Sequence, residues 1–189
     1  MKRYAFCPVC GARLDRERPA VSGPGMLPCS ACGFEFWQNS KPAVGAFVVR
    51  TIDGRPSVLL TRRGIEPHKG TWDTPGGYLK NGEHPEEGLA RELREELGAA
   101  IVRPRLLTVS IDEYPREDVA EEARFVLTLF YRCDIRGDAP LAPADDVAEA
   151  AWFPLDEPPP PIGFPGAVSA LSFLRESLRR DPVPGPGSG

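Results

Sequence analysis

Long apolar runs are missing from this sequence of 189 residues. No apolar stretch reaches the roughly 18 residues that a membrane-spanning helix needs. The segment from Met1 to Cys10 also lacks the apolar core of a secretory signal peptide. We therefore expect no membrane partner and a cytoplasmic location.

An excess of positive charge is missing as well. The chain carries 23 basic and 27 acidic residues, which gives a formal net charge of −4. Domains that hold nucleic acid by bulk electrostatics are usually basic, and no helix-turn-helix pattern is visible here. A nucleic-acid partner is therefore not expected. The length suffices for one domain of ordinary size with a small appendage.

Apolar periodicity is scarce before Trp37, where four of the five cysteines lie. These four form two Cys-x2-Cys pairs, Cys7 with Cys10 and Cys29 with Cys32, separated by 18 residues. This spacing is typical of a structural zinc site, in which four thiolates fill the tetrahedral shell and leave no position for substrate. Disulfides are the alternative, which a cytoplasmic location disfavours. Cys133 is interpreted as a core residue.

After Pro42 the sequence predicts a mixed sheet with helices. Short β-type runs lie on either side of the turn signal Asp53-Gly54, and a second pair of strands is joined by an acidic loop. Pro85 suits the first turn of a helix and Gly98 the position after its end. The predicted strands are 43–49, 58–60, 106–111, 125–131 and 150–153, the predicted helices are 85–97 and 167–179, and 181–189 is predicted to be a disordered tail.

The first predicted helix concentrates negative charge on one side. Glu92, Glu95 and Glu96 are three and four residues apart, so their side chains project from neighbouring positions on that helix. Like charges at this spacing repel, and a divalent cation would remove the repulsion. Ligands that are all oxygens favour Mg²⁺ or Mn²⁺ over Zn²⁺. The alternative is an ordinary solvated helix face.

The surrounding residues carry a resemblance to a known family. The pattern Gly77-x5-Glu83-x7-Arg91-Glu92-Leu93-x-Glu95-Glu96-x-Gly98 resembles the Nudix box of hydrolases that act on nucleoside diphosphate derivatives. The preceding Trp72-Asp73-Thr74-Pro75-Gly76-Gly77 is also similar to that family. Two departures are mild: Ala99 stands where a larger aliphatic residue is common, and His84 stands where Ser or Thr is common. Neither position is an expected ligand.

The resemblance implies a fold, a metal site and an activity. It implies a Nudix α/β/α sandwich over residues 39–180, preceded by a zinc ribbon over residues 1–38. It implies a catalytic Mg²⁺ bound by Glu92, Glu95, Glu96 and the Gly76 carbonyl, with Arg91 orienting the glutamates and Glu83 belonging to the same catalytic set. The expected reaction is cleavage of a diphosphate bond with release of AMP.

The substrate is less closely defined by the sequence. The order of ribbon, hairpin and box is similar to a short group of FAD or ADP-ribose pyrophosphatases. The NADH pyrophosphatases carry a Ser-Gln-Pro-Trp-Pro-type motif that is absent after this box. NADH, nucleoside triphosphates and dinucleoside polyphosphates stay as alternatives, as do an isomerase on the same fold and a Nudix-like binding module without catalysis. A homodimer is compatible with the resemblance.

Residues outside the box are weaker candidates for function. Each is more often an exposed charge or a locally packed ring than a ligand contact. The candidates for contacting substrate are Arg62, Arg63, Trp72, Tyr78 and Phe164. The candidates for a further acid, acting as base or extra ligand, are first Asp145, Asp146 and Glu149, then Glu113, Asp118, Glu121 and Glu122.

Overall fold

The computed structural model of the chain describes residues 5–14, 26–37, 39–114, 125–137, 140–157 and 160–180. The chain divides into two compact units: Met1–Lys41 with Glu113–Val126, and Pro42–Asp112 with Leu127–Gly189. The predicted tail at 181–189 lies outside the described residues. No helix in the described part of the chain is long and apolar enough to cross a membrane.

The described residues of the first unit form only a small apolar core. Strand β1 (Met26–Pro28) pairs antiparallel with β2 (Glu35–Trp37), and Phe6 forms an isolated bridge with Arg13. Its buried cluster consists of Cys7, Leu14 and Cys29, with Ala12 and Leu27 packed against it. So small a cluster rarely stabilises a fold without a metal or disulfides.

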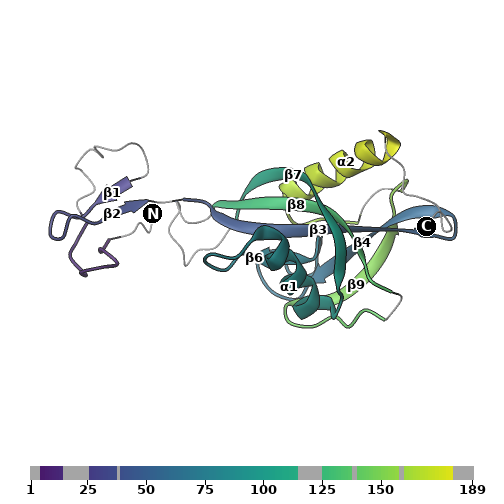
Figure 1. The fold of residues 1–189 in the computed structure, drawn as a ribbon, viewed down its shortest axis with the longest axis horizontal. Coiled ribbons are helices and arrows are strands. Elements are labelled where there is room, and N and C mark those ends of the chain that lie inside the picture. Colours follow the sequence, from purple (N-terminus) through teal and green to yellow (C-terminus); the bar gives the residue numbers. More distant parts are fainter. Residues whose placement is uncertain are drawn as a thin grey trace. The chain divides into compact units, whose positions relative to one another are not determined.

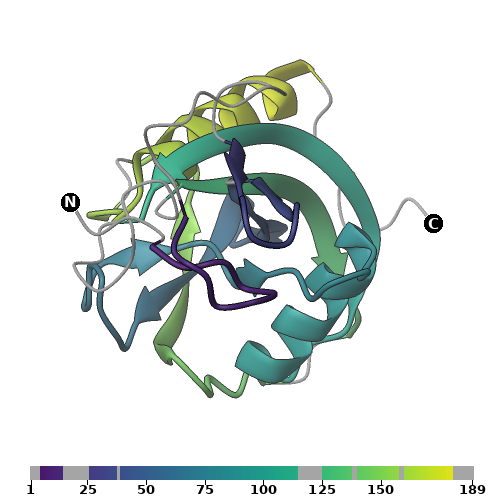
Figure 2. The same ribbon diagram turned by 90° about the vertical axis from the view of Figure 1, so that its left-hand side faces the viewer.

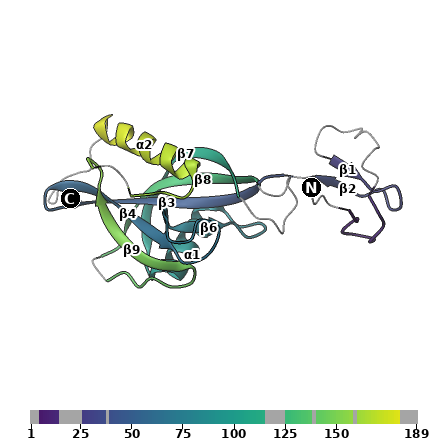
Figure 3. The same cartoon turned by 180° about the vertical axis from the view of Figure 1, so that it is seen from behind.

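The second unit is a sheet with a helix on each face. Its strands follow the order β5-β4-β3-β8-β7, with β6 added to β3 and β9 added to β4. Helix α1 (Pro85–Leu97) and helix α2 (Pro165–Arg180) lie on opposite faces (Figures 1 and 3), which gives an α/β/α sandwich. The strands are β3 (Lys41–Ile52), β4 (Arg55–Arg63), β5 (Trp72–Asp73), β6 (Gly76–Tyr78), β7 (Ile101–Glu113), β8 (Phe125–Ile135) and β9 (Val147–Pro154).

The predicted hairpin is confirmed between β3 and β4. Val49 lies opposite Val58 and Ile52 opposite Arg55 in an antiparallel register. The two turn residues have positive φ angles, 50° at Asp53 and 78° at Gly54. Tight hairpins of type I′ require positive φ at both central residues, which an Asp-Gly pair supplies at low cost.

The predicted helix before Gly98 is confirmed with the same bounds, Pro85–Leu97. The His84 side chain accepts a hydrogen bond from the Glu86 backbone N–H at 3.3 Å, so this histidine caps the helix in place of Ser or Thr. Gly98 closes the helix in the left-handed conformation at φ 65°. Both ends of α1 are therefore fixed by local sequence.

The main core lies between α1 and the sheet. Leu89, Leu93 and Leu97 form the apolar stripe of α1 and are fully buried. They belong to one cluster with Val44 and Val48 of β3. The residues between these two, including Phe47, are also buried, so β3 is covered on both faces. This explains why its sequence is a continuous apolar run instead of an alternating one. This core holds α1 against the sheet and thereby fixes the place of its acidic side.

Several elements differ from the sequence expectations in extent. The strands predicted at 106–111, 125–131 and 150–153 are longer in the structure, and the second helix extends over Pro165–Arg180. Strands β5 and β6 were not expected at all. They contain two and three residues within a Gly/Pro-rich segment and exist by pairing with β4 and β3. Such short strands carry no periodicity of their own.

Candidate active site

The acidic side of α1 faces the loop that carries Gly76 and Gly77. Glu96 is only 5% exposed, and one of its carboxylate oxygens accepts a hydrogen bond from the Gly76 N–H at 2.9 Å. A Cβ atom at Gly77 would lie 2.8 Å from the Glu92 carboxylate, so a larger residue at this position would displace that carboxylate. The two glycines therefore bring backbone and carboxylates into direct contact.

Arg91 is the centre of the hydrogen-bond network beside this contact. Its guanidinium donates twice to Glu83, at 2.7 and 2.8 Å, in a forked geometry. The same group donates to Glu92 at 2.7 Å and to Glu95 at 3.0 Å. It also donates to the Tyr78 carbonyl at 3.1 Å. One side chain thus connects three acids to the β6 backbone.

The pKa values divide the acids into two groups. Burial raises the pKa of Glu96 to about 9, against the opposing Gly76 N–H, and the charges of Asp146, Glu92 and Asp73 raise it further. Burial also raises the pKa of Glu92, which Arg91 partly offsets. By contrast, hydrogen bonds from Arg91 and the Lys80 N–H lower the pKa of Glu83 to about 2. A charged Glu96 therefore calls for a cation, whereas Glu83 is already paired.

The three predicted metal-binding glutamates are neighbours held by different donors. Glu92 and Glu95 are turned to Arg91, and Glu96 to the Gly76 N–H. Among the described residues, the four cysteines are the only group of three or more potential ligands that lie close enough together to hold a metal ion as they stand. The chemistry of the donor set nevertheless fits a hard divalent ion, since it consists of carboxylate oxygens beside the half-buried backbone of Gly76.

A second acidic segment lies next to Glu96. The segment before β9 is bonded to the end of α1, because the Ala144 N–H donates to the Glu96 carbonyl at 2.9 Å and the Ala142 N–H to the Leu97 carbonyl at 3.0 Å. The charge of Asp146 in this segment contributes to the raised pKa of Glu96. The structure therefore places one of the predicted further acids, Asp146, beside the box.

The other candidates for the further acid lie in different surroundings. Asp145 is exposed and has a positive φ of 57°. Glu149 lies on β9 and forms an ion pair with Arg62 at 2.8 Å. Glu113 is an exposed residue at the end of β7. The remaining three, Asp118, Glu121 and Glu122, lie outside the described residues.

Four of the five predicted substrate contacts gather around β4 and β5. Arg63 contacts Asp73 at 3.5 Å, donates to the Pro67 carbonyl at 2.8 Å and lies over the Phe164 ring at 5.2 Å. Phe164 is buried, and Trp72 packs edge-on against Phe153. Arg62, the fourth, pairs with Glu149 as described above. Arg63, Trp72 and Phe164 therefore have structural contacts of their own.

Two further residues of the site are Tyr78, which is exposed, and Asp73, whose carboxyl group is buried. Tyr78 is 42% exposed, and its carbonyl accepts a hydrogen bond from Arg91, so an exposed aromatic residue is bonded to the network through its backbone. Asp73 was missed as a site residue. Burial raises its pKa to about 6, and the Thr74 N–H and Arg63 oppose that shift. Its position directly before Thr74-Pro75-Gly76 was the only available signal in the sequence.

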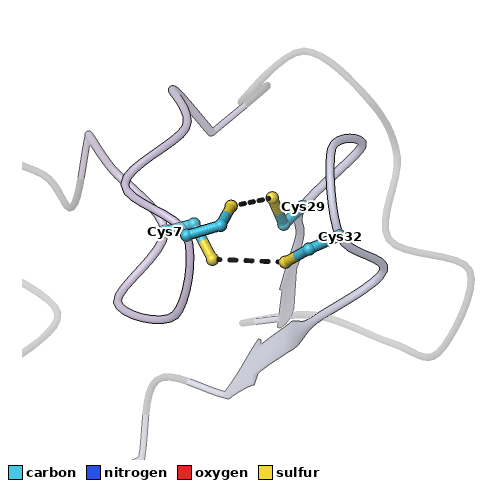
Figure 4. A group of neighbouring side chains, drawn as sticks. Cys7, Cys29 and Cys32 are labelled. Carbon is cyan, nitrogen blue, oxygen red and sulfur yellow. Dashed lines mark hydrogen bonds between the residues drawn. The ribbon is translucent and has the colours of Figure 1, made fainter.

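The four predicted zinc ligands lie together in the first unit (Figure 4). The sulfur atoms of Cys7 and Cys32 are 3.7 Å apart, and those of Cys10 and Cys29 are 3.6 Å apart. These separations exceed the roughly 2.05 Å of a disulfide bond, and all four residues are free thiols. They form a group that could hold a metal ion, with ligand atoms within 4.8 Å of one another.

Comparison with known proteins gives the family. The family model described as the NUDIX domain matches residues 39–171, which is more than half of the chain and contains the Arg91 network. The chain belongs to the Nudix family. A solved Nudix hydrolase from Nitrosomonas europaea superposes with a TM-score of 0.73 at 25% identity, covering 94% of each chain. The expected Nudix fold, an α/β/α sandwich with a mixed sheet, is thereby confirmed.

Two curated relatives carry names that describe activities. An ADP-ribose pyrophosphatase from Methanocaldococcus jannaschii is 35% identical over 142 residues, which cover 74% of this Nudix chain and 72% of the relative. An NAD-capped RNA hydrolase, NudC, from Stutzerimonas stutzeri is 26% identical over 93% of the chain. The chain spans only 56% of that NudC protein, so about half of the relative has no counterpart here.

Proposed function

We propose that this Nudix protein is a Mg²⁺-dependent or Mn²⁺-dependent hydrolase that cleaves the diphosphate bond of a nucleoside diphosphate derivative. The observation that supports this most is the buried Glu96 carboxylate, which meets the Gly76 backbone and other acids, while no basic side chain among the described residues is bonded to it. Burying several acids together is costly unless a cation joins them. A diphosphate brings further negative charge, which the same cation would neutralise.

The residues of the chain take distinct parts in the proposed reaction. Glu92, Glu95, Glu96 and the Gly76 carbonyl would hold the metal. When bound, the ion would neutralise phosphoryl oxygens and lower the pKa of a water molecule. Arg91 keeps Glu92 and Glu95 in place through its hydrogen bonds, with Glu83 as its counterion. The water oxygen attacks phosphorus, the phosphorus–oxygen bond to the second phosphoryl group breaks, and we assign Asp146 as the base that takes the proton.

ADP-ribose or FAD is the proposed substrate, with AMP as one product. The support is the 35% identity to a protein named ADP-ribose pyrophosphatase over most of both chains. The exposed ring of Tyr78, whose carbonyl is bonded to Arg91, is our candidate for stacking against a base. The remaining substrate contacts are proposed to come from Arg62, Arg63, Trp72 and Phe164.

The four-cysteine group is proposed to bind a structural zinc ion. Four thiolates close a tetrahedral shell, and the small apolar cluster of the first unit needs such support. A site of free thiols suits a reducing compartment, which agrees with the proposed cytoplasmic location.

The experiment is hydrolysis of a panel containing ADP-ribose, FAD, NADH, an NAD-capped RNA, a dinucleoside polyphosphate and nucleoside triphosphates. Each is incubated with the chain and Mg²⁺ or Mn²⁺, and products are separated by ion-exchange chromatography. Release of AMP from ADP-ribose or FAD in preference to the others would support the proposal. Preferential cleavage of NADH or capped RNA would shift the substrate to the NudC type. Binding without cleavage would favour the non-catalytic module.

A further inference from the structure

Lys80 is a weakly held cation next to the acids of α1. Its Nζ lies 3.9 Å from one carboxylate oxygen of Glu95, whereas Arg91 donates to the other oxygen of Glu95 at 3.0 Å. The Lys80 side chain is 65% exposed, against 15% for Arg91. An ammonium group has three donors, and an exposed ion pair at this distance contributes little to stability. Lys80 is therefore able to exchange Glu95 for another anion at small cost.

The backbone of Lys80 is held more firmly than its side chain. Its N–H donates to the Glu83 carboxylate at 2.8 Å, and its carbonyl accepts from the Glu83 N–H at 3.1 Å. Glu83 is itself held by the forked hydrogen bonds from Arg91. Figure 2 shows, in teal, the loop between β6 and α1 that carries Lys80. A fixed backbone therefore presents this ammonium group beside the acidic side of α1.

A metal ion bound to Glu95 would change the anion that Lys80 faces. In the proposed function, on which this inference rests, Glu92, Glu95 and Glu96 hold a divalent cation. Such an ion repels an ammonium group that lies 3.9 Å from the same carboxylate. The substrate, in turn, brings negatively charged phosphoryl oxygens to the ion, and lysine is a common partner of phosphate. The phosphoryl oxygens are thus the anions that a released Lys80 would meet.

We propose that Lys80 exchanges partners: it pairs with Glu95 in the metal-free protein and binds a phosphoryl oxygen of the nucleoside diphosphate derivative once the metal is bound. The flexible four-carbon stem of lysine allows this move, whereas the guanidinium of Arg91 is held by its acids. The two roles have opposite effects on binding. Lys80 opposes the binding of Mg²⁺ alone, and it favours the binding of a diphosphate in the presence of Mg²⁺.

The test measures both effects by isothermal titration calorimetry on the full chain. Mg²⁺ is titrated into the metal-free protein, and α,β-methylene-ADP, a diphosphate analogue with an uncleavable bridge, is titrated in saturating Mg²⁺. Lys80→Gln should bind Mg²⁺ about three- to fivefold more tightly and the analogue about tenfold more weakly. Lys69→Gln is the matched control, because Lys69 is exposed between β4 and β5 and its own N–H bonds to Glu66. That variant should leave both dissociation constants unchanged.

The opposite signs distinguish this exchange from a structural role, since a variant that merely loosens the loop would weaken both binding events. Lys80→Arg, which keeps the charge, should stay within about threefold of the wild type in both constants. If the wild type binds Mg²⁺ and the analogue, but Lys80→Gln weakens both or changes neither, the exchange is overturned and the proposed function stands. A wild type that binds both without hydrolysing any substrate would overturn only the proposed reaction. A wild type that binds neither would overturn both proposals.

Discussion

Replacing Arg91 with alanine should destabilise the second unit far more than replacing its neighbour Arg94. Arg91 has a side chain that is 15% exposed and bonds to Glu83 and Glu92, both 13% exposed. Its loss leaves two nearly buried carboxylates without their cation. Breaking a buried pair from one side costs about 3 to 5 kcal/mol. Because this network is partly solvated, we expect the free energy of unfolding to fall by less, about 1 to 3 kcal/mol.

Urea unfolding followed by circular dichroism in Mg²⁺-free buffer measures this change. Arg94 is exposed on the same helix, so Arg94→Ala should cost at most about 1 kcal/mol, mainly through the helix dipole. The double variant Arg91→Ala/Glu83→Gln should be less destabilised than the sum of the single changes, because one buried charge has gone. Equal losses for Arg91→Ala and Arg94→Ala would refute the central place of Arg91 in the network.

Three further predictions follow from the titrating groups and the cysteines. Because Arg91 lowers the pKa of Glu83 from 4.5 to about 2, the stability that Glu83 contributes is present above pH 4.5 and lost towards pH 2. In urea unfolding, the wild type should therefore be more stable than Glu83→Gln at neutral pH, and this difference should vanish in acid. A difference that stays constant with pH would contradict the pairing. Because the pKa of Glu96 is raised from 4.5 to about 9, stability without metal should decline as the pH rises through that range. Mg²⁺ must displace the proton, so its affinity, measured by calorimetry, should increase over the same range, and a flat pH profile would argue against Glu96 as a ligand. Cys29→Ser should lower zinc content and melting temperature while largely keeping turnover; an unchanged melting temperature with lost turnover would place the ribbon in catalysis.

The sequence predicted the elements whose signals are local. Pro85, Gly98 and the Leu89, Leu93, Leu97 stripe lie within one helix, so its bounds follow from capping and periodicity. The Asp53-Gly54 turn likewise defines its hairpin. The sequence also predicted that the four cysteines lie together, because the Cys-x2-Cys spacing is itself a local pattern.

Contacts that depend on tertiary packing were not predictable in the same way. Strands β5 and β6 form only because β4 and β3 offer partners. The buried pair of Arg63 and Asp73 is the clearest case in the site. Arg63 was a candidate for contacting substrate because the forked guanidinium suits phosphate, and simple exposure at a strand end was the alternative. Its contacts with Asp73 and Phe164 require residues that are distant in the sequence.

The most direct test of the proposed metal-dependent hydrolysis is the rate of AMP release from the preferred substrate by the wild type, Glu96→Gln and Glu87→Gln in saturating Mg²⁺. Glu87 lies exposed in the first turn of the same helix, so its amide variant is matched in chemistry but lies outside the network. We predict that Glu96→Gln loses at least about a hundredfold in rate and keeps its fold, while Glu87→Gln stays close to wild type. Near-normal turnover by Glu96→Gln would contradict the assignment of the buried carboxylate as a metal ligand.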